Sequence, residues 1–228
     1  MPKKTKALKK TDENAPWNRK KNAKRKSIET KPLAKTFLIV CEGQTEKLYF
    51  QSFPVVTATV EVIDTKGKTK IQLVEYAENK IETFGNIYDE VWCVFDMDVK
   101  RGEKEFADFD NAINKANALK YKVAYSNDCF ELWFYLHFEF TEQEHLRSFY
   151  YKALGKLWNI SSAKDIKKLA FSKTIYHQLL NDERANQSKA IKRAEKLYHD
   201  KSDLLCHQQN PVTTVFQLVE MLNQNLMP

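Results

Sequence analysis

Four carboxylates stand where two apolar segments of the sequence end, and they are the clearest indication of chemistry in the chain. They are Glu42, Glu46, Asp96 and Asp98. The apolar segments before them, 36–40 and 91–95, have the continuous hydrophobicity of buried parallel strands. Carboxylates that meet at the carboxyl ends of such strands repel each other unless they share a divalent cation. The pattern therefore predicts a Mg²⁺ or Mn²⁺ site and, with it, phosphoryl chemistry.

Alternating strands and helices must hold these carboxylates in place. We expect four strands, at about 35–41, 58–64, 90–96 and 121–126. Three helices alternate with them, at about 44–53, 69–83 and 105–119. This alternation predicts an α/β fold with an open, mainly parallel four-stranded sheet flanked by helices. Later helices are expected at about 128–138, 141–154, 163–180, 182–200 and 211–225, and the first of these should be buried.

Charge and composition divide the chain into three parts. Residues 1–34 contain 12 Lys and Arg against 3 Asp and Glu, whereas the whole chain has a net charge of +7. We predict a flexible basic arm at 1–34, a catalytic domain at 35–140, and a helical C-terminal region at 141–228 packed on it. The arm either holds a nucleic acid by counterion release or only keeps the chain in solution. Its candidate nucleic-acid contacts are Lys20, Lys21 and Arg25.

The remaining bulk features point to a cytoplasmic protein without a membrane segment. No apolar run approaches the roughly 20 residues that span a bilayer. The N-terminus is charged and is followed by no apolar segment of the kind that secretory signals carry. The four cysteines form no CxxC pair, so we expect reduced thiols.

Four segments of the sequence resemble the RloB family. They are FLIVCEGQTEKLYF at 37–50, VFDMD at 94–98, SNDCFELW at 126–133 and NPVTTV at 210–215. The resemblance covers about 35–225 and leaves the basic arm outside. RloB proteins resemble Toprim domains, the catalytic fold of topoisomerases, DnaG-type primases and OLD-family nucleases. In Toprim domains a glutamate follows the first strand and a DxD motif follows the third, as the sequence predicts here.

This resemblance implies roles for individual acids. Asp96 and Asp98 would bind Mg²⁺ or Mn²⁺ directly, and Glu42 would be a ligand or a general acid/base. Glu46 matches a second acid that OLD-type nucleases carry in this helix. Glu131 is either a further acid of the site or a residue that satisfies a polar group beside the buried helix. RloB-like proteins are associated with anti-phage and abortive-infection loci, some beside an ATPase partner, so the resemblance implies a metal-dependent nuclease in phage defence.

Two groups of basic residues are candidates for holding a nucleic-acid backbone. Lys66, Lys68 and Lys70 follow the second predicted strand, at the expected edge of the active site. Lys189, Lys192, Arg193 and Lys196 repeat at helical spacing. A charged stripe of this kind is more often a solvated helix face. DNA and RNA are both candidate substrates.

Two other functions fit parts of the sequence. VFDMD at 94–98 also resembles the nucleophile motif of haloacid-dehalogenase phosphatases, in which Asp96 would form an aspartyl phosphate. That motif normally ends the first strand of its domain, whereas here it ends the third predicted strand. The basic arm fits a non-catalytic subunit that binds or senses nucleic acid for an ATPase. A metal-dependent nuclease accounts for more of the carboxylates than either alternative.

Overall fold

The computed structural model describes residues 35–62, 69–85, 87–98, 102–160, 165 and 168–227. The predicted basic arm, with Lys20, Lys21 and Arg25, lies outside these residues, as do Lys66 and Lys68. Among the described residues, no helix has both the length and the apolar character needed to cross a lipid bilayer. All four cysteines are free, and three of them are buried.

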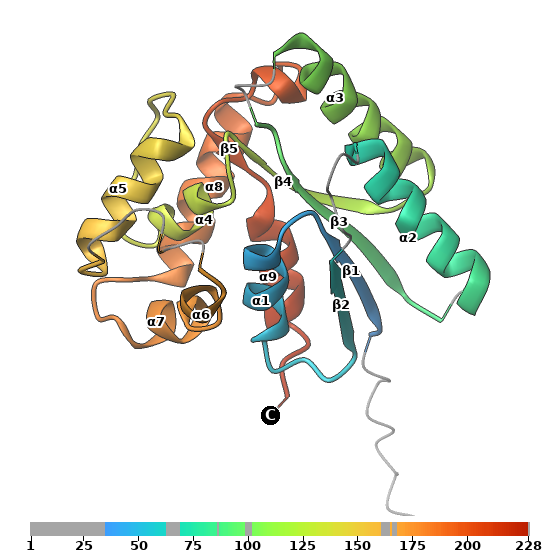
Figure 1. Cartoon of the computed structure of the whole chain (residues 1–228), viewed down its shortest axis with the longest axis horizontal. Coiled ribbons are helices and arrows are strands. Elements are labelled where there is room, and N and C mark those ends of the chain that lie inside the picture. The colour runs from blue at the N-terminus through green and yellow to red at the C-terminus, as the bar shows by residue number, and fades with distance from the viewer. Residues whose placement is uncertain are drawn as a thin grey trace, which may run out of the picture. The chain divides into compact units, whose positions relative to one another are not determined.

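A single five-stranded sheet organises the described residues. The strands are β1 (Phe37–Cys41), β2 (Ala58–Val62), β3 (Glu90–Asp96), β4 (Lys122–Asn127) and β5 (Val212–Thr213), in the order β2-β1-β3-β4-β5. The first four are parallel to their neighbours, and β5 is antiparallel to β4 (Figure 1). The predicted α/β fold with a mainly parallel sheet is therefore confirmed. The number of strands differs, because β5 has two residues and shows no strand pattern of its own.

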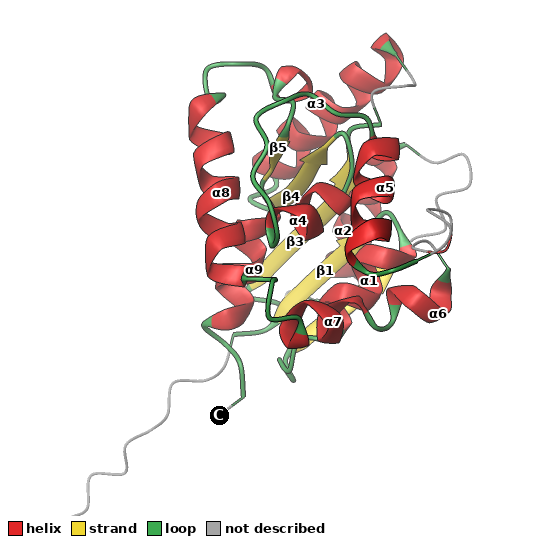
Figure 2. Ribbon diagram, turned by 90° about the vertical axis from the view of Figure 1, so that its left-hand side faces the viewer, coloured by secondary structure: helices red, strands yellow, loops and turns green. Residues whose placement is uncertain are grey.

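Helices cover the sheet on both faces, as Figures 1 and 2 show. The helices α2 (Lys70–Phe84) and α3 (Glu103–Ala118) contact one face. The other face contacts α1 (Gln44–Gln51), α4 (Glu131–Leu136) and α9 (Val215–Asn223). Every residue of β1 is buried, as its continuous apolar sequence requires of a strand covered on both sides.

The helices after residue 136 are shorter than the sequence pattern predicts. They are α5 (Arg147–Leu157), α6 (Leu169–Ser172), α7 (Ile175–Asn181) and α8 (Gln187–Asp200), followed by a 3₁₀ turn at Cys206–Gln208. Contacts with distant residues set two of the starts. The Arg147 N–H donates to Asp128 Oδ2 at 2.7 Å where α5 begins. The last helix begins at Val215 because Val212 and Thr213 pair with β4.

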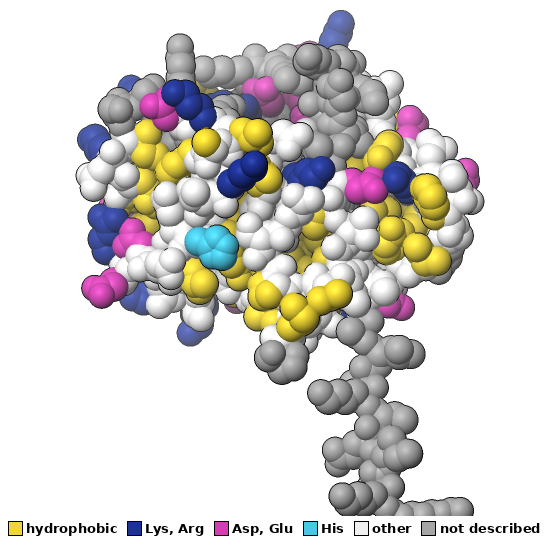
Figure 3. All heavy atoms as spheres, turned by 60° about the horizontal axis from the view of Figure 1, so that its bottom comes forward, with side chains coloured by type: hydrophobic (Ala, Val, Ile, Leu, Met, Phe, Trp, Pro, Cys, Tyr) yellow, Lys and Arg dark blue, Asp and Glu magenta, His cyan; other side chains and the backbone are white. Residues whose placement is uncertain are grey.

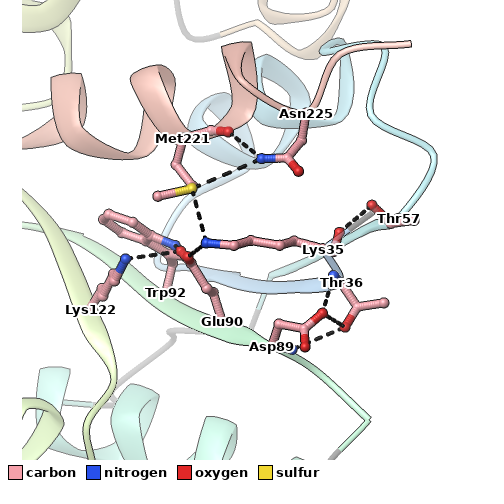
Figure 4. Close-up of polar contacts among 9 residues, drawn as sticks. All are labelled: Lys35, Thr36, Thr57, Asp89, Glu90, Trp92, Lys122, Met221 and Asn225. Atoms are coloured by element: carbon pink, nitrogen blue, oxygen red, sulfur yellow. Dashed lines mark hydrogen bonds and ion pairs between the residues drawn. The ribbon is translucent and has the colours of Figure 1, made fainter. Parts of the chain in front are cut away.

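A polar cluster fixes the amino ends of the strands, at the edge of the sheet opposite the four carboxylates. Figure 4 shows Lys35 and Lys122 converging on Glu90, at 2.8 and 3.1 Å from its carboxylate. Burial raises the pKa of Glu90, but hydrogen bonds from Lys35, Lys122 and Trp92 outweigh it and leave the pKa below the usual value. Asp89 accepts from the N–H of Thr36 at 2.7 Å. These contacts tie the starts of β1, β3 and β4 together.

Candidate active site

The carboxyl ends of β1 and β3 are neighbours, and the acids that follow them lie side by side. Cys41 pairs with Val94 in parallel register. The N–H of Glu42 donates to the carbonyl of Val94 at 2.9 Å. In return, Glu42 Oε2 accepts from the N–H of Asp96 at 3.2 Å. The two strand ends therefore hold Glu42 and Asp96 against each other through the backbone.

These acids face a pocket of about 310 Å³. All five candidate metal ligands line it, together with one arginine and one tyrosine from α5. They are Glu42, Glu46, Asp96, Asp98, Glu131, Arg147 and Tyr151. The structure thus brings the acids of two strands and two helices into one place.

Glycine at position 43 allows Glu46 to reach this pocket. Gly43 is the N-cap residue of α1, with an extended backbone, and a Cβ atom there would collide with the carboxylate of Glu46. Glu46 is 7% exposed and lies in the first turn of α1, where the helix dipole favours a negative charge. The carboxylate of Glu46 can therefore lie this close to the backbone of residue 43 only because glycine has no side chain.

The surroundings of Asp96 disfavour its ionised form. Burial raises its pKa well above the usual value, and the charges of Glu46, Glu131 and Glu42 raise it further. Arg147 opposes this effect. The pocket thus holds more negative charge than its own residues neutralise, which favours binding of a cation.

A divalent cation requires several oxygen ligands placed around one point. Carboxylate oxygens from several elements suit Mg²⁺ or Mn²⁺, which prefer hard oxygen ligands. Within the described part of the chain, however, no three His, Cys, Asp or Glu side chains are placed to hold one ion together. Arg147 is already paired with Asp98, at 3.3 Å. The chemistry fits the ion, and side-chain rotations within the pocket would have to complete the ligand set.

Arg147 is the site residue that the sequence pattern did not indicate. Its guanidinium lies 3.3 Å from both Asp98 and Asp128, and Asp128 is completely buried. Burial lowers the pKa of Arg147, but Asp96, Asp128 and Asp98 raise it above the usual value, so the guanidinium stays protonated. Its Nε is buried and has no hydrogen-bond partner among the described residues. Its partners Asp98 and Asp128 lie 49 and 19 residues earlier in the sequence, so only the fold reveals these contacts.

Asp98 adopts an unusual backbone conformation. Its φ of 49° is in the left-handed region, which Asp tolerates better than most residues but which still costs energy. Its N–H points to the carbonyl of Asp128 at 3.4 Å. Asp98 reaches Arg147 from this turn.

The start of α4 differs from the expected arrangement. A helix was expected at about 128–138, but α4 begins at Glu131, and its N-cap is Phe130, without a side-chain hydrogen bond. Asp128 instead accepts from the backbone N–H of Arg147. Glu131, the first residue of α4, is 4% exposed and lines the acidic pocket.

The described basic candidates do not line the acidic pocket. Lys70 is buried and paired with Glu105 of α3. Arg193 donates to the carbonyl of Leu136 at 2.7 Å, which ties α8 to α4. Lys196 is exposed and pairs with Glu142 and Asp200. Lys189 and Lys192 are exposed on α8.

One protein-family model matches most of the chain. The family model described as RloB-like protein matches residues 37–222. Neither the search of curated proteins nor the search of solved structures gave a match. The match covers most of the chain, including both acidic strand ends and the helices after them up to Leu222 of α9, and confirms the predicted resemblance. On this evidence the chain belongs to the family of RloB-like proteins.

Proposed function

We propose that this protein is a Toprim-type, divalent-metal-dependent nuclease that hydrolyses phosphodiester bonds of DNA or RNA. The observation that carries the proposal is the convergence of Asp96 with Glu42, Glu46 and Glu131 in one pocket. Acids that converge in a pocket, with the pKa of at least one of them raised as for Asp96, are typical of catalytic and metal-binding sites. The order of the acids, with Glu42 directly after β1, Asp96 at the last position of β3 and Asp98 two residues later, resembles the Toprim arrangement.

In this reaction the acids would bind the metal ion, and Arg147 would bind the phosphate. Asp96, Asp98 and Glu42 would hold the ion, with Glu46 and Glu131 as further ligands or proton acceptors. A bound Mg²⁺ or Mn²⁺ would supply a water of lowered pKa and neutralise charge on the phosphate. Arg147 has a secure positive charge at the edge of the pocket, so it can pair with a phosphate oxygen as guanidinium groups commonly do.

The family supports a setting for this activity. RloB-like proteins are associated with anti-phage and abortive-infection loci, some of them beside an ATPase. We therefore infer a cytoplasmic role in phage defence, with a nucleic acid as substrate and an ATPase as a candidate partner.

A cleavage assay tests the proposal. Wild-type protein, Asp96→Asn and the control Glu103→Gln are incubated with double-stranded DNA, tRNA and mRNA in Mn²⁺, and the ends produced are sequenced. Glu103 is exposed in the first turn of α3 and does not line the pocket. We expect cleavage by wild type and by Glu103→Gln, and a loss of at least about a hundredfold in Asp96→Asn.

Each of three results would contradict the proposal. Equal cleavage by Asp96→Asn would remove the pocket from the reaction. Binding of nucleic acid that survives in Asp96→Asn, with no turnover by wild type, would favour a non-catalytic sensing subunit. A phosphoryl adduct trapped on Asp96, with Glu42 dispensable, would favour the phosphatase reaction.

A further inference from the structure

A second cavity lies apart from the acidic pocket. It has a volume of about 310 Å³ and is bordered by α1, α7, the start of α8 and the end of α9. It shares no lining residue with the acidic pocket, and no Asp, Glu, Lys or Arg is among its described lining residues. This size is at the lower end of the range of cavities that bind small molecules. An uncharged ligand would therefore meet no unpaired charge in it.

His137 offers this cavity a hydrogen-bond acceptor. The side chain is 2% exposed and lines the cavity. Its Nδ1 lies 2.9 Å from the carbonyl oxygen of Trp133, so Nδ1 carries the proton and Nε2 carries the lone pair. Burial lowers the pKa of His137 to about 4, which keeps the ring neutral. Among the described residues, Nε2 has no donor partner.

Tyr49 offers the same cavity a hydrogen-bond donor. Its hydroxyl accepts from Trp133 Nε1 at 2.8 Å. Burial raises the pKa of Tyr49, so the hydroxyl keeps its proton. In the part of the chain that is described, the bond from Trp133 is the one hydrogen bond of this hydroxyl, and the O–H proton has no acceptor there.

The start of α8 adds further donors. The Asn186 side chain accepts from the N–H of Lys189 at 2.8 Å and caps the helix. The N–H groups of Gln187 and Ser188, which also line the cavity, have no partner among the described residues. First-turn N–H groups of a helix attract an oxygen with partial negative charge. A carbonyl oxygen of an uncharged ligand satisfies this requirement.

We propose that this cavity binds an uncharged heterocycle with adjacent N–H and C=O groups, the edge that uracil and guanine present. The ligand N–H would donate to His137 Nε2, and its carbonyl oxygen would accept from the Tyr49 hydroxyl. Tyr176 also lines the cavity and supplies an aromatic wall. Bases are commonly held by aromatic side chains in this way. The inference stands on the cavity alone and does not depend on the proposed nuclease activity.

The surrounding surface agrees with an uncharged ligand. The helix α7 and the C-terminal end of the chain, which border the cavity, lie at the bottom of Figure 1. Figure 3 brings this side forward and shows hydrophobic and uncharged side chains between scattered charged ones. A base can approach such a surface either as a free nucleoside or as part of a polynucleotide.

Calorimetric titration of the full chain tests the proposal, with uridine, guanosine and a single-stranded oligouridylate as probes. We expect uridine or guanosine to bind, and 3-methyluridine, whose N–H is blocked, to bind at least about tenfold more weakly than uridine. Tyr49→Phe should weaken binding by about tenfold. Its matched control is Tyr150→Phe, because the Tyr150 hydroxyl is buried, has no hydrogen-bond partner among the described residues, and lines neither pocket. Binding that is confined to the oligouridylate and is lost when Ala185→Trp fills the cavity would identify a polynucleotide as the source of the base.

Several outcomes would overturn the proposal. It fails if none of the three probes binds, or if uridine and 3-methyluridine bind equally well. It also fails if Ala185→Trp, a variant of a residue that lines the cavity, keeps wild-type affinity. The comparison of the two nucleosides on wild-type protein needs no variant, so it remains valid if Tyr49→Phe fails to fold.

Discussion

The guanidinium of Arg147 lies 3.3 Å from the carboxylate of Asp98, and this ion pair links the start of α5 to the end of β3 beside the acidic pocket. Asp98 follows β3, whereas Arg147 begins α5, 49 residues later in the chain. The same guanidinium also meets the buried Asp128. Arg147 thus neutralises part of the acidic charge and ties the helix that carries it to the end of the sheet.

Loss of Arg147 should destabilise the fold. In Arg147→Met the completely buried Asp128 loses its ion pair with Arg147, which typically costs about 3 kcal/mol. The control is Arg184→Met, whose partner Asp182 forms an exposed pair that contributes less than about 1 kcal/mol. Urea unfolding of the two variants measures the difference. Equal free energies of unfolding would show that Arg147 has no structural role.

Removal of the Asp96 charge should stabilise the fold while it abolishes activity. The raised pKa of Asp96 means that its ionised form is disfavoured in the folded chain, chiefly by burial and then by Glu46. Asp96→Asn should therefore raise the free energy of unfolding at pH 8, because the substitution removes a charge that the folded chain disfavours. Addition of Mn²⁺ should raise the melting temperature of wild type and leave that of Asp96→Asn unchanged. A variant less stable than wild type would contradict this reading of the pocket.

Gly43→Ala should impair the site with little effect on stability. The added Cβ would collide with the carboxylate of Glu46, a flexible group that can move away, so the free energy of unfolding should change by less than about 1 kcal/mol. Cleavage should fall because Glu46 leaves its position. Gly155→Ala is the control, since its Cβ would meet the Ile160 carbonyl at an ordinary 3.6 Å. Unchanged cleavage by Gly43→Ala would show that the position of Glu46 is not required.

Acid should weaken the fold through His137. Burial lowers its folded-state pKa to about 4, below the usual 6.5, so the unfolded chain binds the proton first. The free energy of unfolding should therefore fall as the pH drops below 6.5, by about 2 kcal/mol at pH 5. His137→Asn should lose this part of the pH dependence, and the exposed His177→Asn should retain it. Equal slopes in both variants would assign the acid sensitivity to other groups.

Local sequence patterns predicted the parts of the fold that depend on neighbouring residues. The apolar runs of β1 and β3 indicated buried strands, and Glu42 and Asp96 directly after them fall at the same edge of the sheet. β5 was missed because it exists only through pairing with β4, where Thr214 Oγ1 accepts from the Tyr125 N–H at 2.9 Å.

The sequence did not reveal the positions of Arg147 and Lys70, because both depend on contacts with residues far away in the chain. Arg147 enters the pocket through partners far away in sequence, which no spacing rule reveals. Lys70 was a candidate phosphate contact because it follows the second strand. The structure buries it against Glu105 of α3, a pairing that depends on how α2 and α3 pack.

The most direct test of the metal-dependent site is anomalous diffraction from a crystal soaked in Mn²⁺. The account predicts an anomalous peak in the acidic pocket, within bonding distance of Asp96 and of Glu42 or Asp98, with Arg147 moved away from Asp98. The peak should be missing from Asp96→Asn crystals soaked in the same way. An empty pocket in wild-type crystals, at a Mn²⁺ concentration that supports full cleavage in solution, would contradict the account.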